Sequence, residues 1–555
     1  MNANAKHLWW QTGVIYQIYP RSFKDTTGNG IGDLRGIIEG LDYLSDTLGI
    51  DALWLSPFYP SPMADFGYDV ADHTDVDPLF GDLAAFDELV AQAHRRGLKI
   101  IIDLVLNHTS EQHPWFVESR ASRDNPKRDW YIWADPRPDG ARPNNWLSLF
   151  GGSVWEWDAA TGQYYLHSFL KEQPDLNWHH PAVQAAMFDV ARFWLERGVD
   201  GFRVDAAQCI VKDPALRDNP PKLSSSRSIH KPVGDYDSQI HLYDKNRPEA
   251  HAVYRQLRQL LDTYSTTSPR VSLGEIHIFD WPQWASYYGK HLDELHMPLN
   301  FALLGVAWQA QAIRQVVDSL EAVLPAPART TPPGGWPNYV LGNHDEARLA
   351  TRYGPALARV AAMLLLTLRG TPTLYYGDEI GMTDVSIPPE QQQDPWGLHV
   401  PGLGRDPCRT PMQWNAGPNA GFGAPDTPSL WLPLSPDYQQ VNVQRQLADP
   451  TSILNLYRRL LTYRQATPAL QWGSYQALDG VPEGCYAFVR QSPADDQRVL
   501  IALNFSDQEQ RVTLPHWGQG KIVLSTHLDR EEVIDLSRLV LRDHEGVCCS
   551  IVSDA

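Results

Sequence analysis

Short apolar runs alternate with helical patterns along most of the chain. Such runs, apolar throughout and separated by helices, indicate a parallel sheet that is covered on both faces. Eight strands of this kind fit a closed barrel better than an open sheet, so the sequence predicts an α/β fold, a (β/α)₈ TIM barrel. The predicted strands are Val14–Tyr19, Ala52–Phe58, Leu98–Leu106, Gly201–Ala206, Val271–Ile276, Met297–Phe301, Tyr339–Asn343 and Thr373–Tyr376, and the clearest helical patterns are Leu34–Leu48, Leu83–Arg96, Ala182–Arg197 and Ala356–Leu368.

Two segments depart from this alternation. Residues 109–179 are rich in Trp, Pro, Asn and Gly and are too long for a plain loop, which predicts a subdomain inserted after the third strand. Beyond Gln471 the polar and apolar residues alternate with a period of two, as in Tyr486–Arg490, Arg498–Asn504 and Lys521–Ser525. We therefore expect the barrel in residues 1–108 and 180–470, the insertion in 109–179, and an all-β C-terminal domain in 471–555.

Composition and charge exclude several classes of protein. Hydrophobic residues make up 43% of the chain and charged residues 20%, which is typical of a globular protein rather than a disordered one. With 47 basic and 66 acidic residues the net charge is −19, so non-specific binding to nucleic acid or to anionic membranes is excluded. The 20 Trp, 23 Tyr and 16 Phe suit the stacking of sugars, although a large core also uses aromatic residues.

The cysteines and the apolar stretches bear on location. The five cysteines are scattered and include no CxxC pair, so neither a zinc site nor a disulfide framework is indicated, and free thiols in a reducing compartment are expected. The N-terminal segment lacks the apolar core of a signal peptide, and the longest apolar stretch, Ala361–Leu368, is too short to span a bilayer. We expect a cytoplasmic protein without a membrane partner.

Polar residues gather where four of the predicted strands end. The carboxyl ends of barrel strands meet on one rim, and there the groups that could carry catalysis collect. Three carboxylates around one pocket suit acetal hydrolysis, in which one attacks the anomeric carbon, one protonates the leaving oxygen and one orients hydroxyls. Arg203 lies two residues before Asp205 on the same strand face and would keep it ionised, while His108 and His344 would bind hydroxyls or else be core histidines. The strand ends are Asp103 to His108, Arg203 to Asp205, Gly274–Glu275 and Asn343 to Asp345.

These segments resemble a known family. DLVLNH, GFRVDAA, GE and LGNHDE are similar to the four ordered signature blocks of the α-amylase family of glycoside hydrolases, family 13. QPDLNW (Gln173–Trp178), GDEIGM (Gly377–Met382) and GRDPCRTPMQW (Gly404–Trp414) resemble blocks of its α-glucosidase and oligo-1,6-glucosidase branch. The resemblance extends from about Val14 to Trp414, and it implies the barrel, the inserted domain and a C-terminal β-sandwich.

The resemblance also implies roles for individual residues. Asp205 matches the nucleophile, Glu275 the general acid/base, and Asp345 the carboxylate that holds the 2- and 3-hydroxyls. A blocked pocket end implies exo-action on a non-reducing terminal glucose, and a retaining mechanism implies that the Asp205 and Glu275 carboxyls lie ~5–5.5 Å apart rather than ~6.5–9.5 Å. The residues that match the glucose subsite are Asp65, Tyr68, His108, Phe169, Arg203, His344 and Arg405, which is expected to pair with Asp65 in preference to Arg409.

A glycine-rich segment, DTTGNGIGD, resembles the metal loop of the family. Alternating oxygen ligands suit a hard cation, here a structural Ca²⁺ or Mg²⁺. Thr27 and Asn29 replace more strongly liganding or charged residues of the family pattern, which weakens the site and leaves a capped turn without metal as the alternative. The ligands would be Asp25, Thr27, Asn29, the Ile31 carbonyl and Asp33; no organic cofactor is implied.

Specificity is indicated by residues near the nucleophile. Val after the nucleophile tends to accompany α-1,6 preference in the family, so Ala206 favours α-1,4 or mixed linkage, and His277 after GEI departs from strict 1,6-glucosidases. LRDNPP (Leu216–Pro221) and YDKNRPE (Tyr243–Glu249) resemble a loop of α-glucosidases that prefer short substrates. We expect a retaining α-glucosidase, monomeric or homodimeric, that acts on maltose and other short α-glucosides.

Two other functions are compatible with the same fold. A transglucosylase or an isomerising enzyme, one that makes trehalose or rearranges sucrose, shares every catalytic residue and differs in how water is kept from the glucosyl-enzyme. A catalytically dead scaffold, like the ectodomain of transporter heavy chains, would lack the carboxylates and carry a membrane anchor. Asp205, Glu275 and Asp345 are all present and no anchor is recognised, which argues against the scaffold, because function is inferred from the site and not from the fold.

Overall fold

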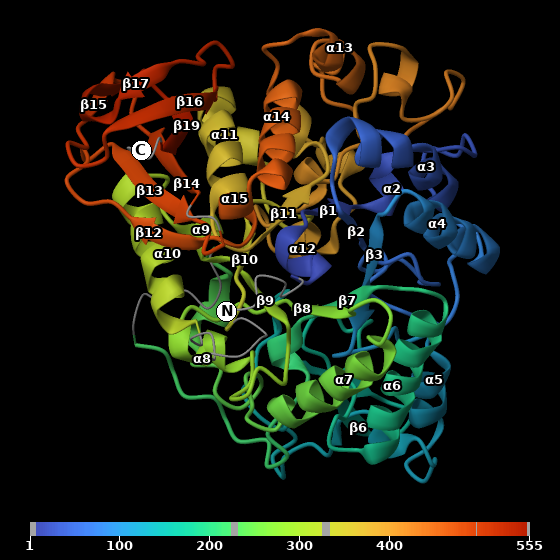
Figure 1. The fold of residues 1–555 in the computed structure, drawn as a ribbon. Helices are drawn as coiled ribbons and strands as arrows, with labels where there is room; N and C mark the ends of the chain where they lie inside the picture. Colours follow the sequence, from blue (N-terminus) through green and yellow to red (C-terminus); the bar gives the residue numbers. More distant parts are fainter. Residues whose placement is uncertain (1–6, 224–230, 325–333, 495–496, 552–555) are drawn as a thin grey trace.

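The computed structural model describes residues 7–223, 231–324, 334–494 and 497–551. Eight parallel strands form a closed barrel, as predicted, in which the last strand pairs with the first, Ile15 facing Thr373. Each strand lies within or overlaps one of the predicted apolar runs, and the barrel occupies the centre of the molecule (Figure 1). In order around the barrel the strands are β1 (Ile15–Ile18), β2 (Ala52–Leu55), β3 (Lys99–Val105), β7 (Gly201–Asp205), β8 (Val271–Gly274), β9 (Met297–Asn300), β10 (Asn338–Val340) and β11 (Thr371–Tyr375).

Amphipathic helices cover the barrel. The Asp82 carboxylate caps α4 by accepting a hydrogen bond from the Ala85 amide, and Pro181 occupies the first turn of α6, both common helix starts. The helices between the strands are α2 (Pro20–Phe23), α3 (Leu34–Glu39), α4 (Leu83–Arg95), α6 (Pro181–Glu196), α7 (Ala250–Tyr264), α8 (Trp281–Ser286), α9 (Ala302–Gly305), α10 (Ala310–Val323) and α11 (Leu349–Thr367). The N-terminal α1 (Trp9–Thr12) and the helices after β11, α12 (Pro395–His399), α13 (Val443–Ala448), α14 (Ile453–Ala466) and α15 (Pro468–Trp472), complete the set.

Two predicted helices differ in detail from those observed. The pattern over Leu34–Leu48 corresponds to α3 and a separate π-helix, Tyr43–Leu48, with Gly40 ending α3. Helix α11 starts before the predicted Ala356, but Gly354 within it has φ 78° and is followed by Pro355. A positive φ is accessible to glycine and breaks helical geometry, so the regular part of α11 begins where the pattern indicated.

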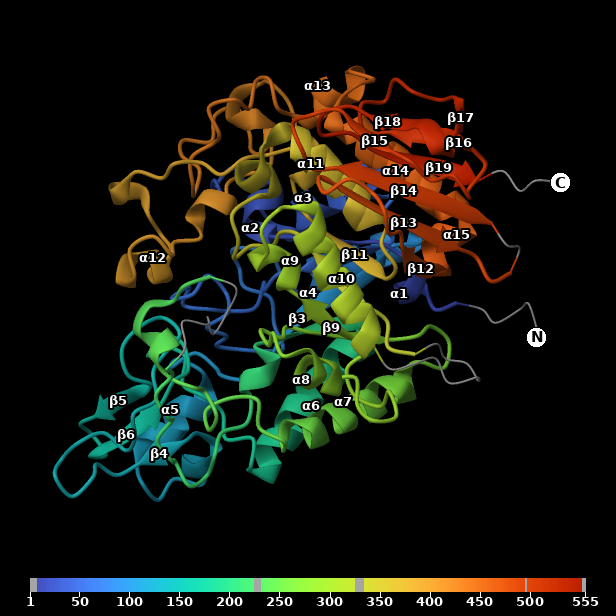
Figure 2. The ribbon, with the colours of Figure 1, turned by 90° about the vertical axis from the view of Figure 1, so that its left-hand side faces the viewer.

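A small sheet is inserted between β3 and α6. Its strands β4 (Trp133–Ala134), β5 (Trp155–Asp158) and β6 (Gln163–Leu166) are antiparallel in the order β4-β6-β5, and α5 (Pro114–Ala121) precedes them. The side chains of Trp146, Val154, Trp155 and Leu166 form its apolar core. The insertion therefore has a core of its own, at the opposite end of the molecule from the C-terminal strands (Figure 2).

The C-terminal strands are all antiparallel. A six-stranded sheet has the order β12 (Ser474–Ala477), β13 (Cys485–Gln491), β14 (Arg498–Asn504), β19 (Gly546–Ile551), β16 (Gln519–Ser525) and β17 (Val533–Asp535), and a second sheet pairs β15 (Gln510–Val512) with β18 (Leu539–Leu541). One apolar cluster joins Val512 and Leu539 of the smaller sheet to Val489 and Leu500 of the larger. The two sheets therefore share a core, as in a sandwich.

Buried arginines join the C-terminal region to the barrel. Arg464 of α14 donates to the Leu366 and Gly370 carbonyls at 3.0 and 2.7 Å, and Arg490 of β13 donates to the Thr367 carbonyl at 2.6 Å. These guanidiniums satisfy carbonyls at the C-terminal end of α11, where positive charge is favourable. Burial lowers the pKa of Arg464 to about 10.

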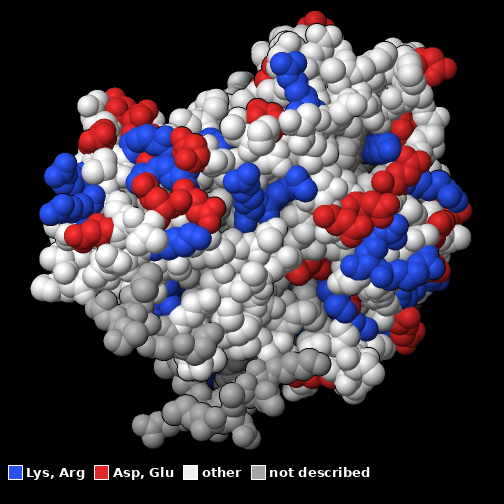
Figure 3. Space-filling model, turned by 45° about the horizontal axis from the view of Figure 1, so that its top comes forward, with Lys and Arg blue, Asp and Glu red and all other residues white. Residues whose placement is uncertain are grey.

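No helix in the described ranges combines the length and the apolar character that crossing a bilayer would require. On the face shown in Figure 3, basic and acidic side chains are interspersed. That face therefore presents no broad positive surface of the kind that nucleic acids or anionic membranes need.

Candidate active site

The predicted site residues converge at the carboxyl end of the barrel. Asp205 is the last residue of β7, Glu275 directly follows β8, and Asp345 lies in the loop after β10. Ten of the eleven residues predicted for catalysis or substrate binding line one pocket, and the eleventh, Arg203, lies beneath its floor. The ten are Asp65, Tyr68, His108, Phe169, Asp205, Ala206, Glu275, His344, Asp345 and Arg405.

Arg203 links the two carboxyls that matter most. Its Nη1 lies 2.6 Å from Asp205 Oδ1 and 2.7 Å from Asp103 Oδ1, and its Nη2 lies 3.0 Å from Glu275 Oε2. Asp205 and Glu275 are thus bound to neighbouring nitrogens of one planar guanidinium. One guanidinium therefore holds the two carboxyls that were predicted to act as nucleophile and general acid.

The protonation of these carboxyls is coupled. Burial raises the pKa of Asp205 well above its usual range, although Arg203 opposes the shift, and burial raises the pKa of Asp103 to about 6. Burial also raises the pKa of Glu275, but Arg203 and His277 outweigh it and hold that pKa below its usual range. Because Asp205 and Glu275 are bound to the same guanidinium, their titrations are linked. The proton that burial favours is therefore shared by the pair of carboxyls and is not assigned to one of them.

The residue after Asp205 has an unusual backbone conformation. Ala206 has φ 44° and ψ 41°, in the left-handed region that non-glycine residues rarely occupy. This turn directs the Ala206 amide to Glu275 Oε2, to which it donates at 2.7 Å. The strain therefore lies at the site and orients a carboxyl there, as strained residues at functional sites often do.

One wall of the pocket is an ion-pair network. Arg405 Nη2 lies 2.6 Å from Asp65 Oδ1 and 2.6 Å from Asp394 Oδ1, and the Gln173 amide donates to Asp65 Oδ2 at 3.1 Å. Arg409, the alternative partner for Asp65, instead lies 3.1 Å from Asp345. The structure therefore forms the Asp65–Arg405 pair and anchors it through Asp394.

Asp345 is held ionised by its neighbours. Arg405, Arg409 and His344 lie 3.2, 3.1 and 3.3 Å from its carboxylate oxygens. Burial alone would raise its pKa, but these groups hold the pKa of Asp345 well below its usual range. At neutral pH the site therefore keeps one full negative charge opposite the Asp205–Glu275 pair.

The two predicted histidines of the site, His108 and His344, are neutral. Burial lowers the pKa of His344 to about 3 and that of His108 to about 4. His344 Nε2 lies 2.8 Å from the Tyr68 hydroxyl, and the two rings stack at 5.3 Å. Both histidines line the pocket and also hydrogen-bond to protein groups. Each is therefore packed like a core histidine and still placed where it could bind a hydroxyl.

Several residues of the site were not predicted. Asp103, Gln173 and Glu346 lie inside the motifs already quoted, and His277 is two residues after Glu275, so motif membership and position along the chain could have indicated them. The others come from segments without a clear periodic pattern, where the sequence carries no signal of proximity. They are Phe150, Lys231, Asp394 and Trp396.

The whole chain compares closely with known proteins. The profile described as "Alpha amylase, catalytic domain" matches residues 17–473. The chain belongs to the α-amylase family. As a member of this family of glycoside hydrolases, it carries the expected barrel, insertion and C-terminal β domain on one chain.

Relatives within the α-amylase family include hydrolases and a transfer enzyme. A "Probable alpha-glucosidase" of Rhizobium meliloti (strain 1021) is 44% identical over 518 residues, which cover 91% of each chain. An oligo-1,6-glucosidase of Parageobacillus thermoglucosidasius is 36% identical over 581 residues and 98% of each chain. A crystal structure of an α-glucosyl transfer enzyme superposes with a TM-score of 0.90 at 44% identity, covering 99% of this chain and 100% of the other.

In this member of the α-amylase family, the glycine-rich loop forms a capped turn. Asp25 Oδ1 accepts from the Thr27 and Gly28 amides, at 2.9 and 2.8 Å, and its Oδ2 accepts from the Gly30 amide at 2.9 Å. Asp33 accepts from the Thr26 and Gly36 amides. These are the bonds of a capped turn, and they occupy most of the lone pairs that a cation would need.

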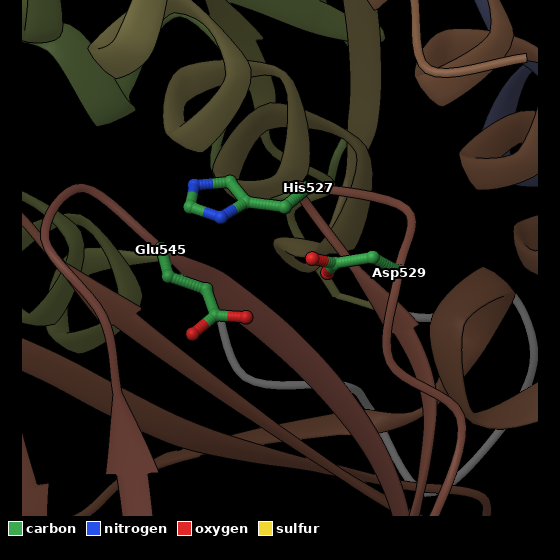
Figure 4. Close-up of side chains that lie close together, drawn as sticks. All are labelled: His527, Asp529 and Glu545. Carbon is green, nitrogen blue, oxygen red and sulfur yellow. The ribbon is translucent and has the colours of Figure 1, made fainter.

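A second acidic group lies in the C-terminal domain of this α-amylase family chain. His527, Asp529 and Glu545 lie close together (Figure 4). Among the described residues, their ligand atoms are near enough to one another to hold a metal ion. However, Arg542 lies 2.7 Å from both Asp529 and Glu545, and Arg530 lies 3.1 Å from Glu545. The guanidiniums already supply the positive charge, so this group does not need a cation.

Proposed function

We propose that the protein is a retaining, exo-acting α-glucosidase that releases the terminal non-reducing glucose from short α-glucosides. The observation that carries the proposal is the pair of carboxyls, Asp205 and Glu275, on one guanidinium, facing a pocket whose far wall is the Asp65–Arg405 ion pair. The similarity to a probable α-glucosidase and to an oligo-1,6-glucosidase supports the same class of substrate.

In the first step of the proposed mechanism, Asp205 attacks the anomeric carbon. Arg203 holds Asp205 Oδ1, which leaves Oδ2 to form the new bond to that carbon. As the glycosidic bond breaks, Glu275 donates its proton to the departing oxygen, so the leaving sugar departs neutral. The product of this step is a β-linked glucosyl ester of Asp205.

In the second step the roles of Glu275 reverse. Its carboxylate accepts a proton from a water molecule, whose oxygen attacks the anomeric carbon and displaces Asp205. Two inversions give α-glucose. Because Asp345 stays ionised beside Arg405 and Arg409, it can stabilise the positive charge that develops on the sugar ring in both transition states.

The remaining residues of the pocket suit recognition of one glucose unit. Asp65 and Arg405 would accept from and donate to hydroxyls at the closed end, and the neutral His108 and His344 would donate to others. Tyr68 stacks on His344 and offers an aromatic face to the sugar. Phe169 stands 5.2 Å from the His108 ring and forms the opposite aromatic wall.

Ala206 supports a preference among linkages. It lines the pocket beside Glu275, on the side where the leaving group departs, and its methyl group is smaller than a branched side chain. A small residue there accommodates an α-1,4-linked leaving sugar, so we propose α-1,4 or mixed specificity.

The anomer that is released first tests this function. We expect the proton spectrum to show α-glucose from maltose before mutarotation, and the rate on maltose to exceed that on isomaltose in a panel that includes nigerose, sucrose and trehalose. Initial β-glucose would contradict the retaining mechanism. Equal rates on maltose and isomaltose would contradict the α-1,4 preference while leaving the mechanism intact.

A second candidate function is glucosyl transfer or isomerisation. The superposition on an α-glucosyl transfer enzyme, with a TM-score of 0.90, favours it, because transfer uses the same two carboxyls with a sugar or alcohol in place of water. Product analysis over time separates the functions. Accumulation of glucosylated acceptor or of a sucrose isomer in preference to free glucose would support transfer.

We propose that the loop of Asp25 to Asp33 is stable without a metal ion, since its carboxylates are occupied by backbone amides. Treatment with EDTA followed by desalting should therefore leave the melting temperature unchanged, and added Ca²⁺ or Mg²⁺ should not raise it. A matched measurement on Asp25→Asn, which keeps one acceptor oxygen but puts an NH2 group against a backbone amide, should lower the melting temperature equally with and without added Ca²⁺. A rise of several degrees with Ca²⁺ would show that the loop binds the ion.

We propose a small glucoside as the partner of this protein and a cytoplasmic location. All five cysteines are buried and unpaired, which suits a reducing compartment. The net charge of −19 disfavours nucleic acid. For the assembly we propose a monomer or homodimer, which sedimentation would distinguish.

A further inference from the structure

The two oxygens of Glu275 have different surroundings. Oε2 accepts from the Ala206 amide at 2.7 Å and lies 3.0 Å from Arg203 Nη2. Both partners are groups that can only donate, so Oε2 has no room for a proton of its own. The proton of the general acid must therefore be carried by Oε1.

Oε1 faces a histidine. His277 Nε2 lies 3.1 Å from Oε1, and the His277 ring is held in place from two sides. The ring stacks on Phe301 with the ring centres 4.5 Å apart and the planes at 10°, while the backbone amide of His277 donates to Gln208 Oε1 at 3.3 Å and so holds the backbone that carries the ring. The imidazole is thus fixed against the one oxygen that carries the catalytic proton.

A protonated carboxyl oxygen has one O–H and can still accept one hydrogen bond. With its proton on Nε2, His277 would donate to Oε1 and occupy one of its two lone-pair directions. The O–H of Glu275 would then be confined to the other direction. His277 lines the catalytic pocket and also an adjoining cavity with Gln208, Tyr236 and Lys245, so it lies on the side where the leaving sugar departs.

We propose that His277 is a positioning residue, which directs the Glu275 proton to the glycosidic oxygen by donating from Nε2 to Oε1. This inference rests on the proposed function, because it needs Glu275 to act as the general acid. It goes beyond that function in naming a residue that is not part of the predicted site and that acts through Glu275 rather than on the sugar.

The charges around Glu275 set the pH dependence that follows. Arg203 and Asp205 of β7 and Asp345 after β10 face it, together with His277. The N–H of His277 favours the ionised form of Glu275, so its removal raises the pKa of that carboxyl and makes it a weaker acid. In a variant without this donor, the basic limb of kcat/KM against pH should move to higher pH.

Leaving groups of different basicity test the proposal. A sugar leaves poorly unless it is protonated, whereas 4-nitrophenolate leaves without a proton. For His277→Leu we expect kcat/KM on maltose to fall roughly 10- to 100-fold, a part of the full contribution of a general acid. The value on 4-nitrophenyl α-glucoside should fall far less. His277→Gln keeps an N–H donor and should recover most of the loss on maltose.

Two controls make the outcome decisive. Phe301→Leu removes the stacking partner but keeps His277, and is expected to lower kcat/KM on maltose more than on 4-nitrophenyl α-glucoside, by a smaller factor than His277→Leu does; melting curves show that each variant is folded. If His277→Leu lowers kcat/KM on both substrates by the same factor, and His277→Gln does not restore kcat/KM on maltose, then His277 is only part of the pocket wall and the proposal is overturned. If the wild type turns over neither substrate, the proposed function itself fails instead.

Discussion

Replacing Asp205 with Asn is expected to lower kcat on maltose by on the order of 10⁵-fold, the scale seen when an enzyme loses its covalent nucleophile. The amide cannot form the glucosyl ester, whereas its shape and its contact with Arg203 are kept. Burst and steady-state kinetics on 4-nitrophenyl α-glucoside measure the loss. Circular dichroism and melting curves should show an unchanged fold.

A rescue experiment separates a nucleophile from a merely buried carboxylate. In Asp205→Ala, sodium azide can occupy the space of the carboxylate and attack the anomeric carbon of the nitrophenyl substrate. We expect β-glucosyl azide as the product, because a single displacement inverts the configuration. Wild-type turnover by Asp205→Asn, or an α-azide from Asp205→Ala, would refute the assignment of Asp205.

Replacing Arg203 with Met is expected to destabilise the fold by about 3–5 kcal/mol at neutral pH, the cost of removing one partner of a buried ion pair. Asp103, Asp205 and Glu275 would then share the interior without the guanidinium at 2.6–3.0 Å that now faces them. Urea unfolding at a series of pH values measures the free energy. Activity should be lost with it.

The loss of unfolding free energy in Arg203→Met should depend on pH. Burial already raises the pKa of Asp103 to about 6, above its unfolded value of about 4, and loss of Arg203 raises it further. Below about pH 6 both folded proteins hold this proton, whereas above it the wild type releases the proton and the variant keeps it, so the deficit of the variant relative to the wild type grows as the pH rises through about 6 and shrinks as the pH falls. Arg21→Met is the control, because the Arg21 guanidinium lies over the Phe66 and Trp431 rings. A deficit independent of pH in Arg203→Met would contradict the argument.

Strand patterns predicted the barrel well because buried parallel strands are apolar on both faces. Each predicted run overlaps a strand, and polar residues at the strand ends mark the rim where Asp205 and Glu275 meet. Periodicity could not show where helical geometry changes. The π-helix of Tyr43–Leu48 and the break at Gly354 depend on local backbone geometry that a hydrophobic pattern does not encode.

The site was predictable only where a residue sits in a motif or at a strand end. Asp394 and Trp396, at the start of α12, contact Arg405, but no motif marks them, and their role depends on a fold that brings Asp65, 340 residues before Arg405, to the same guanidinium. The sequence shows His277 as a departure from the pattern of strict 1,6-glucosidases. Its contact with Oε1 of Glu275 depends on side-chain geometry, which the sequence does not give. For the loop of Asp25 to Asp33 the spacing of oxygens is compatible with a metal site and with a capped turn, and the hydrogen bonds to backbone amides are the observation that favours the turn.

The two arginines that contact the end of α11 bear on how the protein unfolds. Arg464 and Arg490 lie on either side of the change in sequence pattern near Gln471, yet both donate to carbonyls that follow or end the same barrel helix. Removing the residues after that point would leave the Thr367 carbonyl without its Arg490 donor in the interior. The change of pattern near Gln471 therefore separates two kinds of secondary structure but not two independently stable units. Heat or denaturant should unfold the barrel and the sandwich in a single transition.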